Sequence, residues 1–177
     1  FSGESVPIYR FDIREALDRE LLVNSYFHSQ TLRLIKLVPR YFSAIEPILK
    51  EKGIPEDFKY LAVAESGLDA RAVSPAGAVG LWQFLRNTGK EYGLEINSEV
   101  DERYHIKKST FAASDYLLSA YEKFGTWSMV AASYNAGMAG VVRQIERQKS
   151  SSYYDLLFNQ ETSRYLFRIF ALKLILE

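Results

Sequence analysis

The residue best suited to chemistry in this chain is Glu65, which ends a short apolar segment that begins at Pro55. Spacings of three, one and three residues place it on one helical face with Phe58, Leu61 and Ala62. The carboxyl group therefore continues an apolar stripe, where loss of hydration disfavours its charged form and raises its pKa. A carboxylic acid that stays protonated near neutral pH can act as a general acid. From this segment alone, a helix end that turns Glu65 to water is an equal alternative.

A loop rich in glycine follows Glu65 and offers polar groups to a ligand. Its central stretch reads Ser74-Pro-Ala-Gly77-Ala-Val-Gly80-Leu-Trp82-Gln83. Gly77 and Gly80 leave room for a bulky ligand at the backbone and permit unusual dihedral angles. Trp82 offers an aromatic face, and Gln83 offers a donor and an acceptor that suit an acetamido group or a sugar hydroxyl. An ordinary tight connection with a surface glutamine is the alternative interpretation.

A helix of small residues further along the chain ends in a second polar motif, Tyr134-Asn135-Ala136-Gly137. We expect Gly137 to take the left-handed conformation at the helix C-terminus. Tyr134 would then reach outward from the helix end, where its hydroxyl could bond a carboxylate or a sugar. A core tyrosine beside a capped helix is the alternative interpretation.

Helices must position these groups, because apolar residues follow helical spacing nearly throughout the chain. The predicted helices are 12–27, 29–52, 55–65, 81–85, 88–92, 107–124, 127–135, 139–148 and 161–176. We expect Pro39 and Pro47 to kink or divide the second helix and Gly53 to end it. No segment alternates apolar and polar residues for long enough to predict a sheet. The sequence therefore predicts an all-α protein.

Composition narrows the possible partners. The 177 residues include 47% hydrophobic residues, and the 22 basic and 22 acidic side chains cancel without any block of like charge, so nucleic acid is not expected as a partner. There is no cysteine for thiol chemistry, and no apolar run is long enough to span a bilayer. His28 and His105 lie far apart without ligand-type neighbours, so we expect no metal. The first residue, Phe1, suggests a trimmed or mature fragment without its export signal.

Taken together, the motifs resemble the lytic transglycosylase (SLT) domain of glycoside hydrolase family 23. The first signature is Glu65-Ser66 followed by Ser74-x-x-Gly77-Ala78-x-Gly80-Leu81-Trp82-Gln83, and the second is Tyr134-Asn135-Ala136-Gly137. A membrane-bound subgroup of the family is matched further by Trp82-Gln83-Phe84, Thr88-Gly89-x-x-Tyr92-Gly93-Leu94, Asp101-x-Arg103, Ser109-Thr110-x-Ala112-Ala113-x-Asp115-Tyr116-Leu117 and Glu161-Thr162-x-Arg164-Tyr165. The resemblance covers about residues 54–174 and departs from the pattern at 158–160.

The resemblance implies a lysozyme-like helical fold with a glycan cleft and neither metal nor cofactor. It implies cleavage of the β-1,4 bond between N-acetylmuramic acid and N-acetylglucosamine in peptidoglycan glycan strands, which leaves a 1,6-anhydromuramic end, with Glu65 as the single acid and base. The implied substrate-binding residues are Ser74, Gln83, Tyr134, Asn135, Glu161 and Tyr165. Glu161 also suits simple charge compensation at a helix N-terminus.

We expect residues 1–53 to form N-terminal helices that pack on a catalytic domain of residues 54–177, in a monomer. The resemblance places the protein in the periplasm or at the outer membrane. A lysozyme-like muramidase with the same acid is the nearest alternative function. A non-catalytic glycan-binding module is a second alternative, and a helical protein-interaction domain has the least support.

Overall fold

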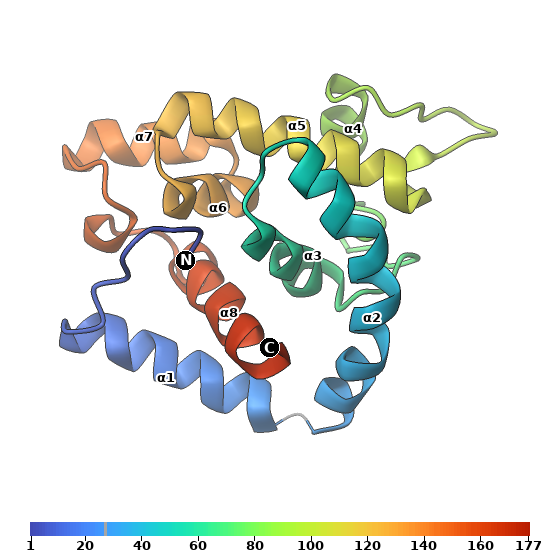
Figure 1. Ribbon diagram of the computed structural model, residues 1–177. Helices are drawn as coiled ribbons and strands as arrows, with labels where there is room; N and C mark the ends of the chain where they lie inside the picture. Colours follow the sequence, from blue (N-terminus) through green and yellow to red (C-terminus); the bar gives the residue numbers. More distant parts are fainter. Residues whose placement is uncertain (27) are drawn as a thin grey trace.

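The computed structural model describes residues 1–26 and 28–177, and these are mostly helical (Figure 1). The α-helices are α1 (Phe11–Tyr26), α2 (His28–Glu51), α3 (Lys59–Ser66), α4 (Arg86–Glu91), α5 (Ile106–Phe124), α6 (Trp127–Ala136), α7 (Met138–Gln148) and α8 (Gln160–Leu176). Short 3-10 helices span Glu56–Phe58, Glu102–Tyr104 and Tyr153–Asp155. Among the described residues, β-structure is limited to isolated bridges that join Val73 to Val79, Val79 to Phe84 and Ile96 to Asp101. The predicted all-α fold is confirmed.

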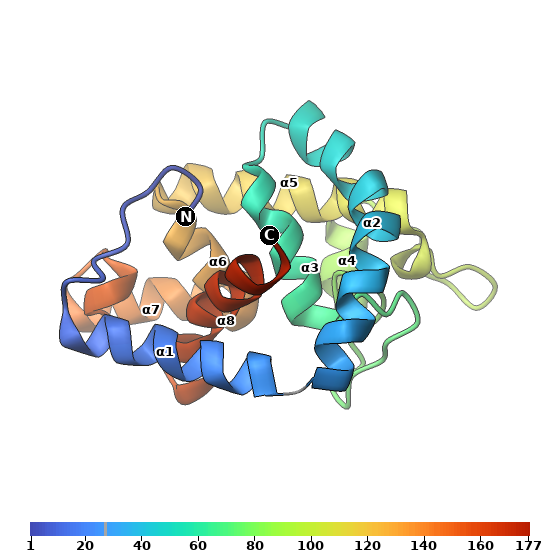
Figure 2. The ribbon, with the colours of Figure 1, turned by 60° about the horizontal axis from the view of Figure 1, so that its bottom comes forward.

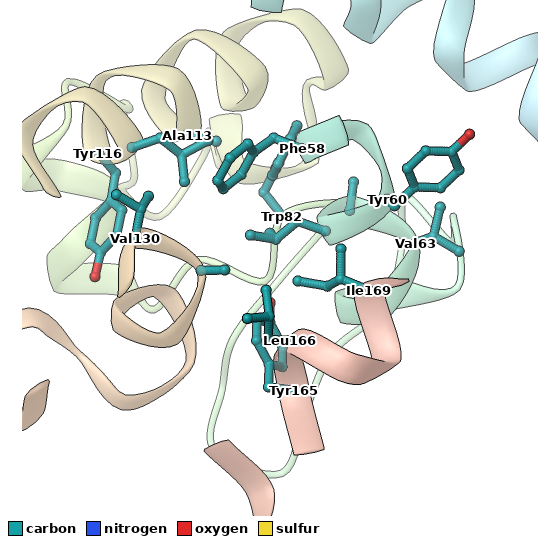
Figure 3. Close-up of a cluster of buried hydrophobic side chains, with 14 of the residues drawn as sticks. Phe58, Tyr60, Val63, Trp82, Ala113, Tyr116, Val130, Tyr165, Leu166 and Ile169 are labelled. Atoms are coloured by element: carbon teal, nitrogen blue, oxygen red, sulfur yellow. The ribbon is translucent and has the colours of Figure 1, made fainter. Parts of the chain in front are cut away.

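Helix α8 has a largely buried face that packs against several other helices. It contacts α1, α3 and α6, while α2 crosses and contacts α5 (Figure 1). Its buried residues include Tyr165, Leu166 and Ile169, which lie among side chains from α3 and α6 (Figure 3). The same core cluster extends to Ile13 of α1 and Phe42 of α2. The helical periodicity of the sequence is thus used to bury one continuous apolar interior.

Helix α2 is continuous although Pro39 and Pro47 lie inside it, so of the two predicted outcomes, a kink or a division, the division is wrong. Each proline removes one backbone hydrogen bond of the helix. The buried residues Phe42, Ile45 and Leu49 anchor the helix against the core, and such tertiary packing supplies most helical stability in proteins. Packing therefore outweighs the local preference for a break.

Segment 81–85 is a turn and not the predicted helix. The N–H of Gln83 donates to the carbonyl of Gly80 at 3.2 Å, and the N–H of Val79 donates to the carbonyl of Phe84 at 3.0 Å. These bonds close a compact loop in which Leu81 and Trp82 are buried. The apolar residues of this segment therefore belong to the hydrophobic core although they lie in a loop.

Gly137 differs from the expected left-handed helix cap. Its φ of 73° is positive, but its ψ of 145° lies outside the left-handed helical region, in backbone space that glycine reaches readily. Gly67 does adopt the left-handed conformation and ends α3 directly after Ser66. No helix among the described residues is both long and apolar enough to cross a membrane.

Candidate active site

Glu65 lies in the last turn of α3, half-buried at the end of a segment whose preceding residues are buried in the core. Burial raises the pKa of its carboxyl group from 4.5 to about 7. A hydrogen bond from Tyr165 and the charge of Arg168 lower this pKa, while the charge of Glu161 raises it. The raised pKa expected from the apolar helical face is therefore confirmed, because desolvation outweighs the favourable partners.

Two tyrosines share the electrostatic environment of Glu65. The hydroxyl of Tyr165, on α8, donates to Oε1 of Glu65. The side chain of Tyr165 is only 1% exposed and lies within the buried core (Figure 3). The hydroxyl of Tyr134, on α6, donates instead to the carbonyl of Trp82 at 2.7 Å. Burial and the charge of Glu65 raise the pKa of both tyrosines well above the ordinary value of 10. Both hydroxyls therefore stay protonated and act as hydrogen-bond donors.

Two cavities flank this group of residues. The first, which we call the arginine cavity, measures about 450 Å³ and lies between α1, α2, α3 and α8, with walls that include Glu20, Arg33, Glu65, Arg164 and Arg168. Figure 2 shows α1 and the start of α2 approaching each other beside α3 and α8. The second, the tyrosine cavity, measures about 570 Å³, with walls that include Gln83, Glu91, Tyr92, Tyr116, Tyr134 and Asn135. Both volumes suit a ligand of several connected groups.

The glycine-rich loop is fastened by Arg103, a buried residue that the sequence does not mark as structural. Its Nη1 donates to the carbonyls of Gly77 at 3.1 Å and Phe84 at 3.0 Å, and Asp101 holds its guanidinium at 2.6 Å. A Cβ atom at Gly80 would collide with the carbonyl oxygen of Arg103. The prediction that this glycine makes room for a ligand is therefore wrong, because protein backbone fills the space. Gly77 does have open space around it.

The loop also fixes the orientation of Gln83. Its φ of 49° is left-handed, and its Nε2 donates to the carbonyls of Ala72 at 3.2 Å and Gly80 at 2.8 Å. The amide nitrogen is thus engaged within the loop, which leaves the amide oxygen to a ligand as an acceptor. Trp82 is 0% exposed, and its indole N–H donates to Thr110 at 2.9 Å. The expected open aromatic face of Trp82 is therefore wrong.

A buried charge network lines the arginine cavity. Glu20 of α1 is 1% exposed and pairs with Nε of Arg164 at 2.6 Å and Nε of Arg168 at 3.9 Å. Arg168 also bonds Glu161 at 3.2 Å. Sequence reasoning overlooked Glu20, although Ile13 and Leu17 precede it by seven and three residues on the same helical face. That spacing is the signal that singled out Glu65.

The described residues contain no group of three or more histidine, cysteine, aspartate or glutamate side chains that could hold a metal ion. His105 has a structural task, because its Nδ1 accepts the backbone N–H of Lys108 at 3.3 Å at the start of α5. The side chain of His28 lies outside the described residues.

Comparison with known proteins decides the family. The model of the transglycosylase SLT domain matches residues 43–157. The chain belongs to the transglycosylase SLT domain family. Membrane-bound lytic murein transglycosylase D of Escherichia coli strain K12 is 34% identical over 170 residues, covering 93% of this chain. The SLT domain chain described here spans only 37% of the length of that relative.

Solved structures share the fold of this SLT domain. The 70 kDa soluble lytic transglycosylase of Escherichia coli superposes with a TM-score of 0.64 at 22% identity, over 77% of this chain and 24% of that chain. Lytic transglycosylase Slt of Pseudomonas aeruginosa, solved as an inactive mutant, gives a TM-score of 0.63 at 19% identity, over 79% of this chain and 25% of that chain. The fold is the lysozyme-like helical fold that the motifs implied.

The SLT domain brings most of the predicted site residues together. Gln83, Tyr134 and Asn135 line the tyrosine cavity, and the amide oxygen of Asn135 accepts the hydroxyl of Thr162 on α8 at 2.8 Å. Tyr165 bonds Glu65 and is only 1% exposed, and its contact with substrate stays a prediction. These geometries leave substrate binding by Gln83, Tyr134 and Asn135 as a prediction.

Two predicted binding residues of the SLT domain lie outside both cavities. Ser74 closes a turn, where its Oγ accepts the N–H of Ala78 at 3.0 Å. Glu161 is exposed in the first turn of α8 and pairs with Arg168. Contact of either residue with substrate stays a prediction. Within the protein, Ser74 stabilises a turn and Glu161 forms an ion pair.

Proposed function

We propose that this SLT domain is a peptidoglycan lytic transglycosylase. It would cleave the β-1,4 bond between N-acetylmuramic acid and N-acetylglucosamine and leave a 1,6-anhydromuramic end. The observation that carries the proposal is Glu65, whose carboxyl has a pKa of about 7, receives the hydroxyl of Tyr165 and lies on the wall of a cavity. The name of the relative, a lytic murein transglycosylase, supports the same substrate class.

In the first step, protonated Glu65 donates its proton to the oxygen of the glycosidic bond. A pKa near 7 leaves a large fraction of the carboxyl protonated at neutral pH and still makes it a competent donor. Positive charge develops on the muramic acid ring as the bond breaks. The acetamido oxygen of the substrate stabilises this charge, in the place that a second carboxylate occupies in ordinary glycosidases.

In the second step, ionised Glu65 removes the proton from the C6 hydroxyl of the muramic acid, and that oxygen bonds to C1. The nucleophile belongs to the substrate and is already oriented, so its effective concentration exceeds that of water. Tyr165 assists because its hydroxyl stabilises the ionised carboxylate by a charge-assisted hydrogen bond. Glu65 returns to its protonated form, because the proton that it takes from the C6 hydroxyl replaces the one that it gave to the glycosidic oxygen.

We propose that no other carboxylate shares this chemistry. Glu20 lines the arginine cavity but is buried against Arg164 and Arg168. Glu161 is exposed and paired with Arg168. Glu91, on the wall of the tyrosine cavity, is exposed on α4. The pairing of Glu20 and Glu161 with arginine favours their structural roles over catalysis.

We propose that glycan sugars bind in the tyrosine cavity. The amide oxygen of Gln83 and the side-chain amide of Asn135 can bond hydroxyl and acetamido groups there, and Tyr134 offers a ring edge and a hydroxyl. We further propose that the domain acts as a monomer on glycan strands in the periplasm or at the outer membrane, in keeping with the membrane-bound relative.

Mass spectrometry of digested peptidoglycan tests this function. We expect new muramic ends that lack one water relative to reducing ends, and we expect Glu65→Gln to release none. New reducing ends in place of anhydro ends would identify a muramidase and refute the transglycosylase. Binding of glycan without any cleavage by the unmodified protein would identify a non-catalytic module instead.

A further inference from the structure

A side-chain hydrogen bond joins helices α6 and α8, which pack against each other, at the wall of the tyrosine cavity. The hydroxyl of Thr162, in the first turn of α8, donates to Oδ1 of Asn135 at 2.8 Å. Asn135 lies in the last turn of α6 and lines the tyrosine cavity. Thr162 is 1% exposed and does not line that cavity. The bond therefore connects a buried residue to one that a ligand can reach.

The backbone of Thr162 is held at both its polar groups, which gives its side chain a defined position. Its N–H donates at 2.8 Å to Oδ1 of Asn159, the residue that caps the N-terminus of α8. Its carbonyl accepts the hydroxyl of the buried Tyr153 at 2.9 Å. Threonine is also branched at Cβ, which restricts the rotation of its side chain. These contacts fix the hydroxyl of Thr162 as a partner for Asn135.

The bond from Thr162 decides which atom of the Asn135 amide is left to a ligand. An asparagine amide carries an acceptor oxygen at one end and a donor nitrogen at the other. The oxygen is engaged by Thr162, and no hydrogen bond among the described residues uses the nitrogen. For Gln83, on the same cavity wall, the nitrogen is engaged within the loop and the oxygen is left over. The cavity thus presents one fixed donor and one fixed acceptor.

We propose that Thr162 is a positioning residue for glycan cleavage, because it holds the Asn135 amide so that Nδ2 is the atom offered to the glycan. The inference rests on the glycan-cleaving function proposed above. An oxygen of the glycan accepts from this nitrogen without any turning of the amide on binding. A group that is ordered in the folded protein loses less freedom when the ligand arrives, which strengthens binding. Thr162 acts through Asn135 and does not itself touch the glycan.

A double-mutant cycle on peptidoglycan cleavage tests this inference. Thr162→Val keeps the shape of the side chain without its hydroxyl, and we expect kcat/KM to fall about 5- to 10-fold, the effect of one hydrogen bond. In the Asn135→Ala background, the same change should alter kcat/KM by less than about 2-fold, because no amide is left to orient. Thr162→Ser retains the hydroxyl and should recover most of the parent value. The alkaline decline of kcat/KM should not move, since neither residue contributes to the pKa of Glu65.

Thr126→Val is the matched control, because Thr126 directly precedes α6 at its other end. Its Oγ1 is buried without a hydrogen-bond partner among the residues that the structure describes, so the same chemical change breaks no bond. We expect Thr126→Val to keep the kcat/KM of the parent. Circular dichroism checks the folding of each variant, and Thr162→Ala takes the place of Thr162→Val in the cycle if the valine variant does not fold.

Two results for an active parent protein would overturn the inference alone. An equal loss from Thr162→Val in both backgrounds would show that Thr162 stabilises the fold without orienting Asn135. A Thr162→Ser protein as slow as Thr162→Val would show that the hydroxyl is not the group that matters. A parent protein that leaves peptidoglycan uncut would refute the proposed function, and this inference with it.

Discussion

The arginine cavity and the tyrosine cavity offer opposite environments, and of the two only the arginine cavity has Glu65 on its wall. On one side lie Arg168 and the buried pair of Glu20 with Arg164, whose charges are held by α1 and α8. On the other lie aromatic and amide groups held by α6 and the loop that ends at Gln83. The contrast shows that desolvation raises the pKa of a carboxyl group. Stabilising the same group in its ionised form requires a nearby cation and a hydrogen-bond donor.

The largest expected effect comes from removing the carboxyl of Glu65, which lies on the wall of the arginine cavity. Glu65→Gln keeps the shape of the side chain and its acceptor for Tyr165 but cannot donate or remove the catalytic proton. We expect cleavage of peptidoglycan to fall by about 10³-fold or more, with binding of muropeptides retained. Glu146→Gln, at an exposed position of α7, is the control that should leave cleavage intact. Cleavage by Glu65→Gln at the normal rate would remove the residue from the mechanism.

Two glycines in the loop beside the tyrosine cavity test how closely its backbone packs against the rest of the protein. Gly80→Ala places a Cβ atom against the carbonyl of Arg103 at a φ of 80°, and we expect it to lower the free energy of unfolding by about 3 kcal/mol. Gly77→Ala has a similar φ of 79° but open space, and should cost only about 1 to 2 kcal/mol. Chemical denaturation measures both. Equal losses would show that the carbonyl of Arg103 does not fill the space beside Gly80.

A third prediction concerns the cost of burying Glu65. Between the unfolded pKa of 4.5 and the folded pKa of about 7, the folded protein binds more protons than the unfolded chain. Stability therefore falls as pH rises through this window. Glu65→Gln removes the effect, so it should match the parent at pH 4 and exceed it by about 2 to 3 kcal/mol at pH 8. Denaturation at both pH values measures the difference, and a constant difference would contradict the raised pKa.

Substitutions of Tyr165 and Tyr134 should have smaller effects on activity than Glu65→Gln. Tyr165→Phe removes the hydrogen bond to Glu65 and should lower kcat by about 10- to 100-fold. It should also raise the pKa of Glu65 and move the alkaline decline of kcat/KM to higher pH, with Arg168, Glu161 and Tyr134 still facing the carboxyl. Tyr134→Phe loses a bond to the Trp82 carbonyl and should cost about 1 kcal/mol of stability without moving that decline. A shift in Tyr134→Phe alone would reverse these roles.

Local patterns in the sequence predict the elements and the acid, because helical spacing reports which side of a helix is buried. Helix α5 and the burial of Glu65 follow directly from that spacing. The helix predicted for 81–85 is wrong because this apolar segment is buried in a turn. A backbone hydrogen bond between Val79 and Phe84 closes that turn. The ion pair between Arg164 and Glu20 could not be predicted from local patterns, because the two residues are 144 positions apart in the sequence. The atom that fills the space at Gly80 likewise belongs to the distant Arg103.

The most direct test of the account is a titration of Glu65 itself. Carbon NMR of the side-chain carboxyl, assigned by comparison with Glu65→Gln, follows its ionisation without substrate. We predict a single transition with a pKa of about 7, because burial outweighs the help of Tyr165 and Arg168. A transition near the ordinary value of 4.5 would show that the carboxyl is hydrated and ionised at neutral pH, and would contradict its role as the acid.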